Sequence, residues 1–255
     1  MSDKFVGTRQ TAVQLNRPAP LAIQVAKSLR KLLQRSEYIT GGRLPSEPEL
    51  AAQFGVSRGT IREALAMLER EGMIFRRHGS GTYVNKHALR IQARIEAALE
   101  FSELLRQAGF DASIQLVQAE IEPLPPDIAS LLDTDTDTPA LFVKKLFLAD
   151  DQPAIYCIDV IPERLIQSPY TEEELQRPIF DFLKTHCNES VVNVWAEIIP
   201  EIAEEELTRL LEVDPCKPLI RLEEVSFNSL NLPILFSRVY YKDQFIRFSV
   251  LRKKV

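Results

Sequence analysis

The chain has 255 residues, of which 45% are hydrophobic and 26% charged, and its formal net charge is −5. This length suffices for two domains of ordinary size. No apolar run approaches the roughly 18 residues that a membrane-spanning helix needs. The three cysteines and three histidines are scattered without CxxC or HxxxH spacing, so we expect neither a disulfide framework nor a metal site. The first residues lack the apolar core of a signal peptide, and we expect a cytoplasmic protein.

The charge is divided unevenly along the chain. Residues 1–90 hold 15 Lys and Arg against 7 Asp and Glu, whereas residues 91–255 hold 16 against 29. A basic first third joined to an acidic remainder indicates that one part meets a polyanion and the other does not. Chance clustering of surface charge is the alternative interpretation, and the motifs of the first third bear on it.

The first predicted element is a helix over residues 20–36, preceded by a tail over residues 1–17. The apolar residues of this helix recur at helical spacing and form one stripe, which predicts that it packs against a core. These residues are Leu21, Val25, Leu29, Leu32 and Leu33.

Two further helices follow, with a tight turn between them. Ser46 and Glu49 have the spacing of a capping box, and Gly55 can close the short helix in the left-handed conformation. Ser57 is then placed as the N-cap of a helix that runs to about Glu71. Two helices joined by a short turn that contains a glycine form a helix-turn-helix unit.

A basic hairpin completes this unit. Residues 73–77 and 82–84 are predicted strands, and Gly79 and Gly81 between them permit the positive φ angles of a tight turn. We expect this hairpin to be a wing. The domain over residues 18–84 is therefore predicted to be a winged helix-turn-helix, mainly α-helical with a β wing.

The exposed side of the third helix carries residues suited to reading DNA. An α-helix fits the major groove of B-DNA, and its first residues contact the base edges. Arg58 and Arg62 can each donate two parallel N–H groups to guanine, while Ser57 and Thr60 suit a phosphate. A solvated helix face is the alternative for the arginines, but the turn, the wing and the local charge favour DNA. The predicted DNA-binding residues are Ser57, Arg58, Thr60, Arg62, Arg77, His78 and Gly79.

The segment LPSEPELAAQFGVSRGTIREALAMLEREGMIFRRHGSGTYV resembles the winged helix-turn-helix of the GntR family of bacterial transcription regulators. The resemblance extends over residues 21–84. The family often has an arginine that can touch DNA where this chain has Pro48. The DNA contacts that the resemblance implies fall on Ser57, Arg58, Thr60, Arg62, His78 and Gly79.

After a linker predicted over residues 85–98, the pattern changes to that of an α+β domain over residues 99–255. No catalytic motif such as GxSxG, HExxH or a P-loop occurs, which favours a sensor over an enzyme. The strands are expected to form a mostly antiparallel sheet. Strands are predicted over residues 114–121, 141–148, 155–161, 191–200, 219–227, 234–241 and 245–250, and helices over 101–109, 127–132, 178–187 and 203–211.

This second domain resembles the UTRA effector-binding domain of the HutC subfamily of GntR regulators, on segments such as EFSELLRQAGF, LFVKKLFLADDQPAIYCIDVIPERL and PILFSRVYYKDQFIRFSV. The resemblance implies a chorismate-lyase-like fold with a small-molecule site in a cleft beside the sheet. The predicted effector-binding residues are Ser102, Lys145, Phe147, Cys157, Glu197, Leu235, Arg238 and Tyr240.

The effector is expected to be less polar than a sugar phosphate. Many relatives carry Arg-x-Arg where this chain has Lys145-Leu146-Phe147, and Glu where it has Cys157 and Leu235. A sugar phosphate needs cations for its phosphate and acids for its hydroxyls. An apolar or aromatic metabolite fits better, and its carboxylate, if it has one, would meet Lys145 or Arg238. The alternative is that these positions belong to an unliganded or differently shaped pocket.

The two domains together predict a homodimeric transcription regulator that binds a near-palindromic operator in double-stranded DNA. The function expected is that of a repressor released by a small-molecule effector, without cofactor, metal or membrane partner. The alternative is an enzyme of lyase-like fold that carries a DNA-binding module. Against the enzyme stands the lack of a paired acid and base in a recognisable arrangement.

Overall fold

The computed structural model describes residues 20–33, 38, 41–90, 93–95 and 97–252. The chain forms two compact units, one over residues 1–90 with 253–255 and the other over residues 91–252, and each is described by itself. The predicted tail over residues 1–17 and the predicted end of the first helix, at residues 34–36, lie outside the described residues.

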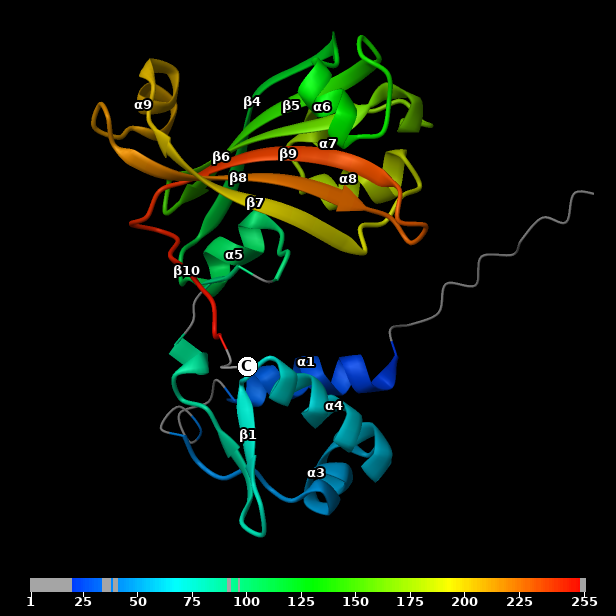
Figure 1. Ribbon diagram of the computed structural model, residues 1–255, viewed down its shortest axis with the longest axis vertical. Helices are drawn as coiled ribbons and strands as arrows, with labels where there is room; N and C mark the ends of the chain where they lie inside the picture. The colour runs from blue at the N-terminus through cyan, green and yellow to red at the C-terminus, as the bar shows by residue number, and fades with distance from the viewer. Residues whose placement is uncertain (1–19, 34–37, 39–40, 91–92, 96, 253–255) are drawn as a thin grey trace, which may run out of the picture. The chain divides into compact units, whose positions relative to one another are not determined.

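The described elements of the N-terminal unit include three α-helices, a two-stranded hairpin and a short 3-10 helix (Figure 1). Helix α4 is followed directly by the hairpin, in which Arg76 pairs with Thr82 and Arg77 with Gly81. The predicted winged helix-turn-helix is thus confirmed. The elements are α1 (Leu21–Leu33), α3 (Glu47–Phe54), α4 (Arg58–Arg70), β1 (Ile74–Arg77) and β2 (Gly81–Val84).

The turn between α3 and α4 follows from local chemistry. Ser46 accepts a hydrogen bond from the Glu49 N–H, and the Glu49 carboxylate accepts one from the Ser46 N–H at 2.7 Å, which completes the predicted capping box. Gly55 ends α3 in the left-handed conformation, with φ 64°. Ser57 then caps α4. Each such cap is worth about 1 kcal/mol, so a few polar residues fix where the two helices begin and end.

One hydrophobic core holds this unit together, and α1 and α4 supply most of it. Leu29, Leu65 and Leu68 are at most 1% exposed, and Leu50 of α3 is equally buried. At the surface, the guanidinium of Arg30 pairs with the Glu71 carboxylate and ties α1 to the end of α4. The outward sides of α4 and of the wing do not pack against this core.

The segment after the wing includes a short 3-10 helix, Ala88–Arg90, and a two-residue strand, β3 (Ala93–Arg94). Strand β3 pairs in parallel with β10 (Phe248–Ser249). The strand predicted over residues 245–250 therefore forms only in part, and it joins β3 instead of the large sheet.

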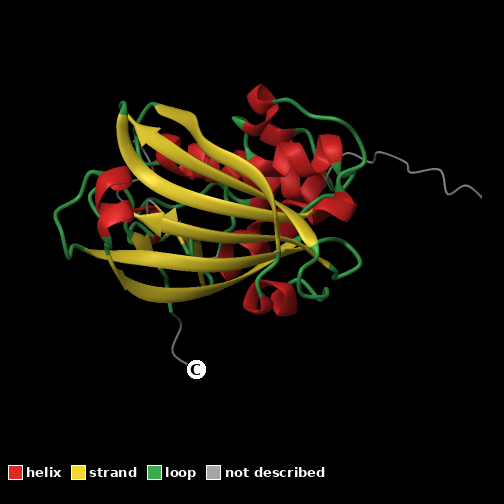
Figure 2. Ribbon diagram, turned by 90° about the horizontal axis from the view of Figure 1, so that it is seen from above, coloured by secondary structure: helices red, strands yellow, loops and turns green. Residues whose placement is uncertain are grey.

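The C-terminal unit is built on one curved six-stranded sheet in which each neighbouring pair is antiparallel (Figure 2). The predicted mostly antiparallel α+β fold is confirmed. The strands, in their order across the sheet, are β4 (Ala112–Pro123), β5 (Pro139–Ala149), β6 (Gln152–Pro162), β9 (Pro233–Tyr241), β8 (Pro218–Phe227) and β7 (Asn193–Ile202).

Helices cover both faces of this sheet, and α5 and α9 lie on opposite sides of it (Figure 1). We call the face against which α5, α7 and α8 pack the α5 face, and the face against which α6 and α9 pack the α9 face. The sequence patterns had not predicted α7. The helices are α5 (Phe101–Gln107), α6 (Pro126–Leu131), α7 (Glu172–Leu175), α8 (Ile179–His186) and α9 (Glu205–Leu211).

The strand register decides which side chains share a face, because paired residues in an antiparallel sheet point to the same side and neighbours along a strand point to opposite sides. Lys145 pairs with Cys157, and Cys157 pairs with Val239, so all three lie on the α5 face. Arg238, the residue before Val239 on β9, pairs with Glu223 on β8. Both therefore lie on the α9 face.

Within the part of the chain that the structure describes, no helix has the length and apolar character needed to cross a membrane.

Candidate DNA-binding surface and effector cavity

The start of α4 is exposed and locally ordered. The Ser57 hydroxyl accepts a hydrogen bond from the Thr60 N–H at 3.1 Å, and the two hydroxyl oxygens lie 2.9 Å apart. Ser57 is exposed and Thr60 is half-buried beside it. The first turn of the helix therefore presents N–H groups and hydroxyls outward, which is the arrangement that binds a phosphate.

Arg58 and Arg62 stand on the outward side of α4. Arg58 is exposed and makes no hydrogen bond or ion pair to any described residue. Arg62 has a side chain that is 67% exposed, and its guanidinium lies 3.2 Å from the carboxylate of Glu47. An exposed ion pair of this kind contributes little free energy, so Arg62 can exchange it for another anion.

In the wing, the guanidinium of Arg77 packs against two aromatic rings. The guanidinium carbon of Arg77 lies 5.4 Å from the ring centre of Phe75 and 4.9 Å from that of Tyr83. His78 and Gly79 form the exposed tip. Gly79 has φ 71°, and a Cβ there would meet nothing within 4 Å, so the glycine serves backbone conformation and not close packing.

Two further arginines, Arg43 and Arg76, lie beside these predicted residues. Arg43 is exposed and forms an isolated β-bridge with Tyr83. A Cβ on Gly81 would come within 2.7 Å of the Arg43 Nε, so this glycine makes room for the arginine. Arg76 lies 3.2 Å from Glu69 and 3.8 Å from Glu47. Arg43 carried no local signal, because it precedes the first helix cap and meets the wing only in the folded chain.

The C-terminal unit contains a cavity of about 530 Å³ on its α5 face. Its volume lies within the range of small-molecule sites, roughly 300–1,000 Å³. The walls come from residues 95 and 97–101, from the start of α8 and from β7, β8 and β9. The lining residues are Ile95, Ala97, Ala98, Leu99, Glu100, Phe101, Leu104, Ile179, Phe180, Val192, Asn193, Val194, Ala196, Ile198, Leu222, Glu224, Ser226, Ser237, Tyr241 and Phe248.

None of the eight predicted effector-binding residues is among those that line this cavity. One group lies at the α5 face, fully or almost fully buried: Ser102, Lys145, Phe147, Cys157 and Leu235. The remaining group lies on the α9 face: Glu197, Arg238 and Tyr240. Because the sheet separates the two groups, the eight residues cannot line a single cavity.

Lys145 is wholly buried and its charge is balanced. Its Nζ lies 3.4 Å from the Asp159 carboxylate and 3.2 Å from the backbone oxygen of Arg177. The other oxygen of Asp159 accepts hydrogen bonds from Ser237 at 2.7 Å and from the Cys157 thiol at 3.3 Å. Burial raises the pKa of Cys157 well above its usual value. In this structure Lys145 is thus engaged by groups of the protein itself, and its predicted role with a ligand carboxylate stays a prediction.

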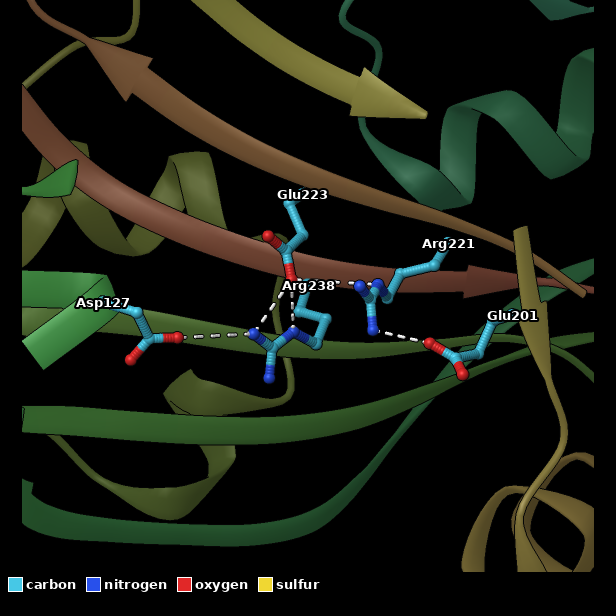
Figure 3. A network of polar contacts seen from close by, with 5 residues as sticks. All are labelled: Asp127, Glu201, Arg221, Glu223 and Arg238. Atoms are coloured by element: carbon cyan, nitrogen blue, oxygen red, sulfur yellow. Dashed lines mark hydrogen bonds and ion pairs between the residues drawn. The ribbon is translucent and has the colours of Figure 1, made fainter. Parts of the chain in front are cut away.

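Arg238 is engaged as well, in a polar network on the α9 face (Figure 3). It lies 2.9 Å from Glu223 and 4.0 Å from Asp127. Arg221 joins Glu223 and Glu201 in the same network. Arg238 is therefore not among the residues that line the cavity, and it has a counter-ion; its predicted contact with a ligand carboxylate also stays a prediction.

Among the described residues, Glu100 and Glu224 are the charged side chains that line the cavity, and neither was predicted from the sequence. Glu100 accepts a hydrogen bond from the Phe180 N–H at 3.0 Å. Glu224 has no hydrogen bond or ion pair with the described residues. Burial raises the pKa of each carboxyl to about 7. Glu100 and Glu224 lie far apart in sequence. Predicting that they share a cavity would have required the register of the strands, which shows the face of the sheet on which Glu224 lies.

No group of three or more His, Cys, Asp or Glu side chains within the described part of the chain is arranged to hold a metal ion.

Comparison with known proteins identifies both units. Residues 21–84 match the family described as bacterial regulatory proteins, gntR family, and residues 107–246 match the UTRA domain. The Bacillus subtilis transcriptional repressor NagR is 25% identical over 210 residues, which are 82% of this chain and 85% of that protein. The Escherichia coli repressor of the mannosyl-D-glycerate system, MngR, is 28% identical over 207 residues, 81% of this chain and 84% of that one.

The fold matches solved structures over nearly the whole chain. The crystal structure of YydK from Bacillus subtilis superposes with a TM-score of 0.73 at 20% identity, covering 92% of this chain and all of the other. PhnF from Mycobacterium smegmatis gives a TM-score of 0.57 at 22% identity, covering 90% of this chain and 99% of the other. On the two family matches and the relatives, this chain is a DNA-binding transcription regulator, not an enzyme, and it belongs to the GntR family with the UTRA domain of the HutC-like architecture.

Proposed function

We propose that this protein is a homodimeric repressor that binds a near-palindromic operator and leaves it when a small molecule occupies the cavity of the UTRA domain. The names of NagR and MngR describe repressors, which supports this sign of regulation. A transcription regulator acts in the compartment that contains the DNA, and we propose that this compartment is the cytoplasm.

The exposed start of α4 carries the DNA-binding part of the proposal. Arg58 projects from the first turn without a partner among the described residues, next to Ser57, which caps the helix. A recognition helix contacts base edges with these first residues. Arg62 would contact the groove after leaving Glu47, while Arg77, His78 and Gly79 of the wing would contact the backbone or the minor groove. Ser57 and Thr60 would bind phosphate.

The position of the cavity supports effector control. Ile95 and residues 97 to 100 form part of its wall, and these residues follow the DNA-binding domain along the chain. We retain residues 85–98 as the linker between the domains. A ligand changes DNA affinity only if it favours one conformation over another. A ligand held against residues 97–100 would bias the linker directly and so the spacing of the two reading helices.

The edge of the large sheet supports a dimer of two copies of this chain. Among the described strands, β7 pairs with β8 alone, so its other side is an open edge of the described sheet. Exposed apolar side chains lie on both faces of this strand, Trp195 on the α9 face and Ile198 and Ile202 on the α5 face, each at least 46% exposed. Open strand edges with apolar side chains are where chains pair. Two-fold pairing doubles the DNA contacts and requires two half-sites.

The lining of the cavity supports an effector less polar than a sugar phosphate. Most of its lining residues are aliphatic or aromatic, and no Lys, Arg or His occurs among those described. A phosphate group needs a cation or several N–H donors. Native mass spectrometry of the purified dimer would reveal a retained small molecule and its mass.

The proposal is tested by DNA binding. An operator is first selected from a random duplex library, and binding is then followed by fluorescence anisotropy. Arg58→Ala should weaken binding to the selected operator by roughly 1–3 kcal/mol. Arg106→Ala is the matched control, since Arg106 is an exposed arginine of α5 in the other domain. Equal affinity of wild type, Arg58→Ala and Arg106→Ala would contradict the proposed reading helix.

A further inference from the structure

The charged groups that face the effector cavity are all acidic within the described residues. Glu100 and Glu224, which are far apart in the sequence, both line it. No Lys, Arg or His occurs in the described lining. Glu100 receives one hydrogen bond, from the Phe180 N–H, and Glu224 receives none from the described chain. Two carboxylates without counter-ions in a largely apolar cavity leave the space electrostatically negative.

The charges behind the cavity wall do not offset these carboxylates. Asp159, Asp181 and Lys145 act on Glu100, and Asp159 acts on Glu224. Lys145 is paired with Asp159 at 3.4 Å and is wholly buried. The single nearby ammonium is thus balanced by one carboxylate, and the negative charge of the cavity remains in excess.

A buried hydroxyl adds an independent sign of a missing partner. Ser226 lines the cavity, is 2% exposed, and its hydroxyl has no hydrogen bond with the described residues. It lies two positions after Glu224 on β8 and therefore on the same face. The Ser226 oxygen is not among the fully buried polar atoms without a partner, so it is accessible from the cavity, where a ligand or water can pair with it.

The rest of the cavity suits an apolar body with a positive end. Phe101, Phe180, Tyr241 and Phe248 line it together with aliphatic residues such as Ile179 and Leu222. Aromatic faces attract cations as well as apolar groups. A ligand carboxylate or phosphate would meet Glu100 and Glu224 in the same space, and like charges in a poorly solvated cavity repel.

We propose that the effector of this regulator is an organic amine, with an ammonium group held by Glu224, Glu100 and the Ser226 hydroxyl and with an apolar or aromatic body held by the cavity wall. This inference rests on the proposed function, because it takes the cavity as the effector site. It replaces the expected carboxylate of the ligand with a cation.

The proposal has a proton signature. Burial raises the pKa of both carboxyls to about 7, so each is partly protonated in the empty cavity near neutral pH. A bound ammonium favours the ionised carboxylate and lowers its pKa. Binding of an amine therefore releases protons and tightens between about pH 6 and pH 8, where an alkyl ammonium of pKa about 10 stays charged.

The test uses three ligands of one shape: 3-phenylpropylamine, 3-phenylpropan-1-ol and 3-phenylpropionate, each up to about 10 mM, a range suited to weak fragments. We expect the amine alone to raise the melting temperature appreciably, and its affinity by calorimetry to rise about fivefold or more between about pH 6 and pH 8. Heats measured in buffers of different ionisation enthalpy should show proton release.

Two variants locate the site, and one serves as the control. Glu224→Gln and Glu100→Gln should each weaken amine binding about tenfold or more, as loss of a charge-assisted partner does. Glu197→Gln should not, because Glu197 is exposed on the α9 face. Thermal unfolding of each variant checks that it folds, and the two independent carboxyl variants keep the test valid if one does not.

The outcomes separate this inference from the proposed function. Stronger binding of the carboxylate, equal binding of all three ligands, no binding of the amine, or amine binding that survives both carboxyl variants would overturn the inference. If the ligand-free protein still binds its selected operator, the regulator assignment stands in each of these cases. Failure to bind any selected operator would instead contradict the proposed function.

Discussion

The two domains handle charge in opposite ways. The DNA-binding domain keeps its arginines in solvent, where Arg58 is unpaired among the described residues and Arg62 holds only an exposed ion pair. The UTRA domain also covers a few of its charged groups, since Lys145 and Asp159 are wholly buried and Glu100 and Glu224 face a largely apolar cavity. Exposed charges cost little and respond to salt, whereas buried charges are costly and respond to pH.

This difference suits the two tasks. A surface that binds a polyanion needs exposed cationic side chains. Their bound water and weak ion pairs can then be replaced by the phosphates. A cavity that discriminates between small molecules gains from groups that are unsatisfied until the right ligand arrives. Each of the following changes tests whether the two domains differ in this way, beginning with the largest expected effect.

The buried ion pair of the UTRA domain should be the most sensitive site. Lys145→Met leaves Asp159 charged and buried, and we expect a loss of about 3–5 kcal/mol in the free energy of unfolding. Urea denaturation measures it. The double variant Lys145→Met with Asp159→Leu should recover much of this loss, because no buried charge is left alone. A single variant as stable as wild type would show that the pair does not carry a buried charge.

The cavity carboxyls should make the stability of the ligand-free protein depend on pH. Their pKa values of about 7 lie above the usual value of 4.5, so the folded protein binds more protons than the unfolded chain between these values. Stability should therefore fall as pH rises from about 4.5 to 7 and then level off, by on the order of 3 kcal/mol per carboxyl. Denaturation of wild type and Glu224→Gln across this range measures it, and identical slopes would contradict the assignment.

The two serine caps of the DNA-binding domain form a matched pair. Ser46→Ala and Ser57→Ala each remove a cap hydrogen bond and should each cost about 1 kcal/mol of stability. Only Ser57→Ala should also weaken operator binding, since Ser57 stands at the start of the reading helix and Ser46 does not. Melting temperatures and anisotropy titrations at a temperature where both fold separate the effects. Equal DNA affinity of the two variants would remove Ser57 from the interface.

The smallest expected effect concerns the wing. Arg77→Ala should weaken operator binding modestly and lower the slope of log K against log salt by about 0.9, the value for one lost phosphate contact. Anisotropy titrations over a series of salt concentrations measure this slope. Arg106→Ala should leave it unchanged. An unchanged slope for Arg77→Ala would place the wing outside the phosphate contacts.

The sequence predicted the first domain well because its determinants are local. Ser46 and Glu49, Gly55 and Ser57 act within three or four residues of one another, so the helix ends could be predicted from the order of residues alone. Arg43 was missed for the opposite reason, because it reaches the wing only through the tertiary fold.

The strands of the second domain were also predictable, but the faces of the sheet were not. Arg238 and Val239 are neighbours along β9, yet the register places one on each face. A choice between them needs the pairing of strands distant in sequence. The same pairing brings Glu224 to a cavity whose wall contains Glu100, and no local pattern links these two residues. The effector residues predicted from sequence therefore divided between two faces.

The central claim is that Arg58 reads a base from the exposed start of α4. Its most direct test is operator selection from a random duplex library with wild type and with Arg58→Ala, read as base preference at each position. We predict that the variant loses preference at one base pair in each half-site, a change of roughly 1–3 kcal/mol, and keeps the others. Identical preferences for the two proteins would contradict the claim.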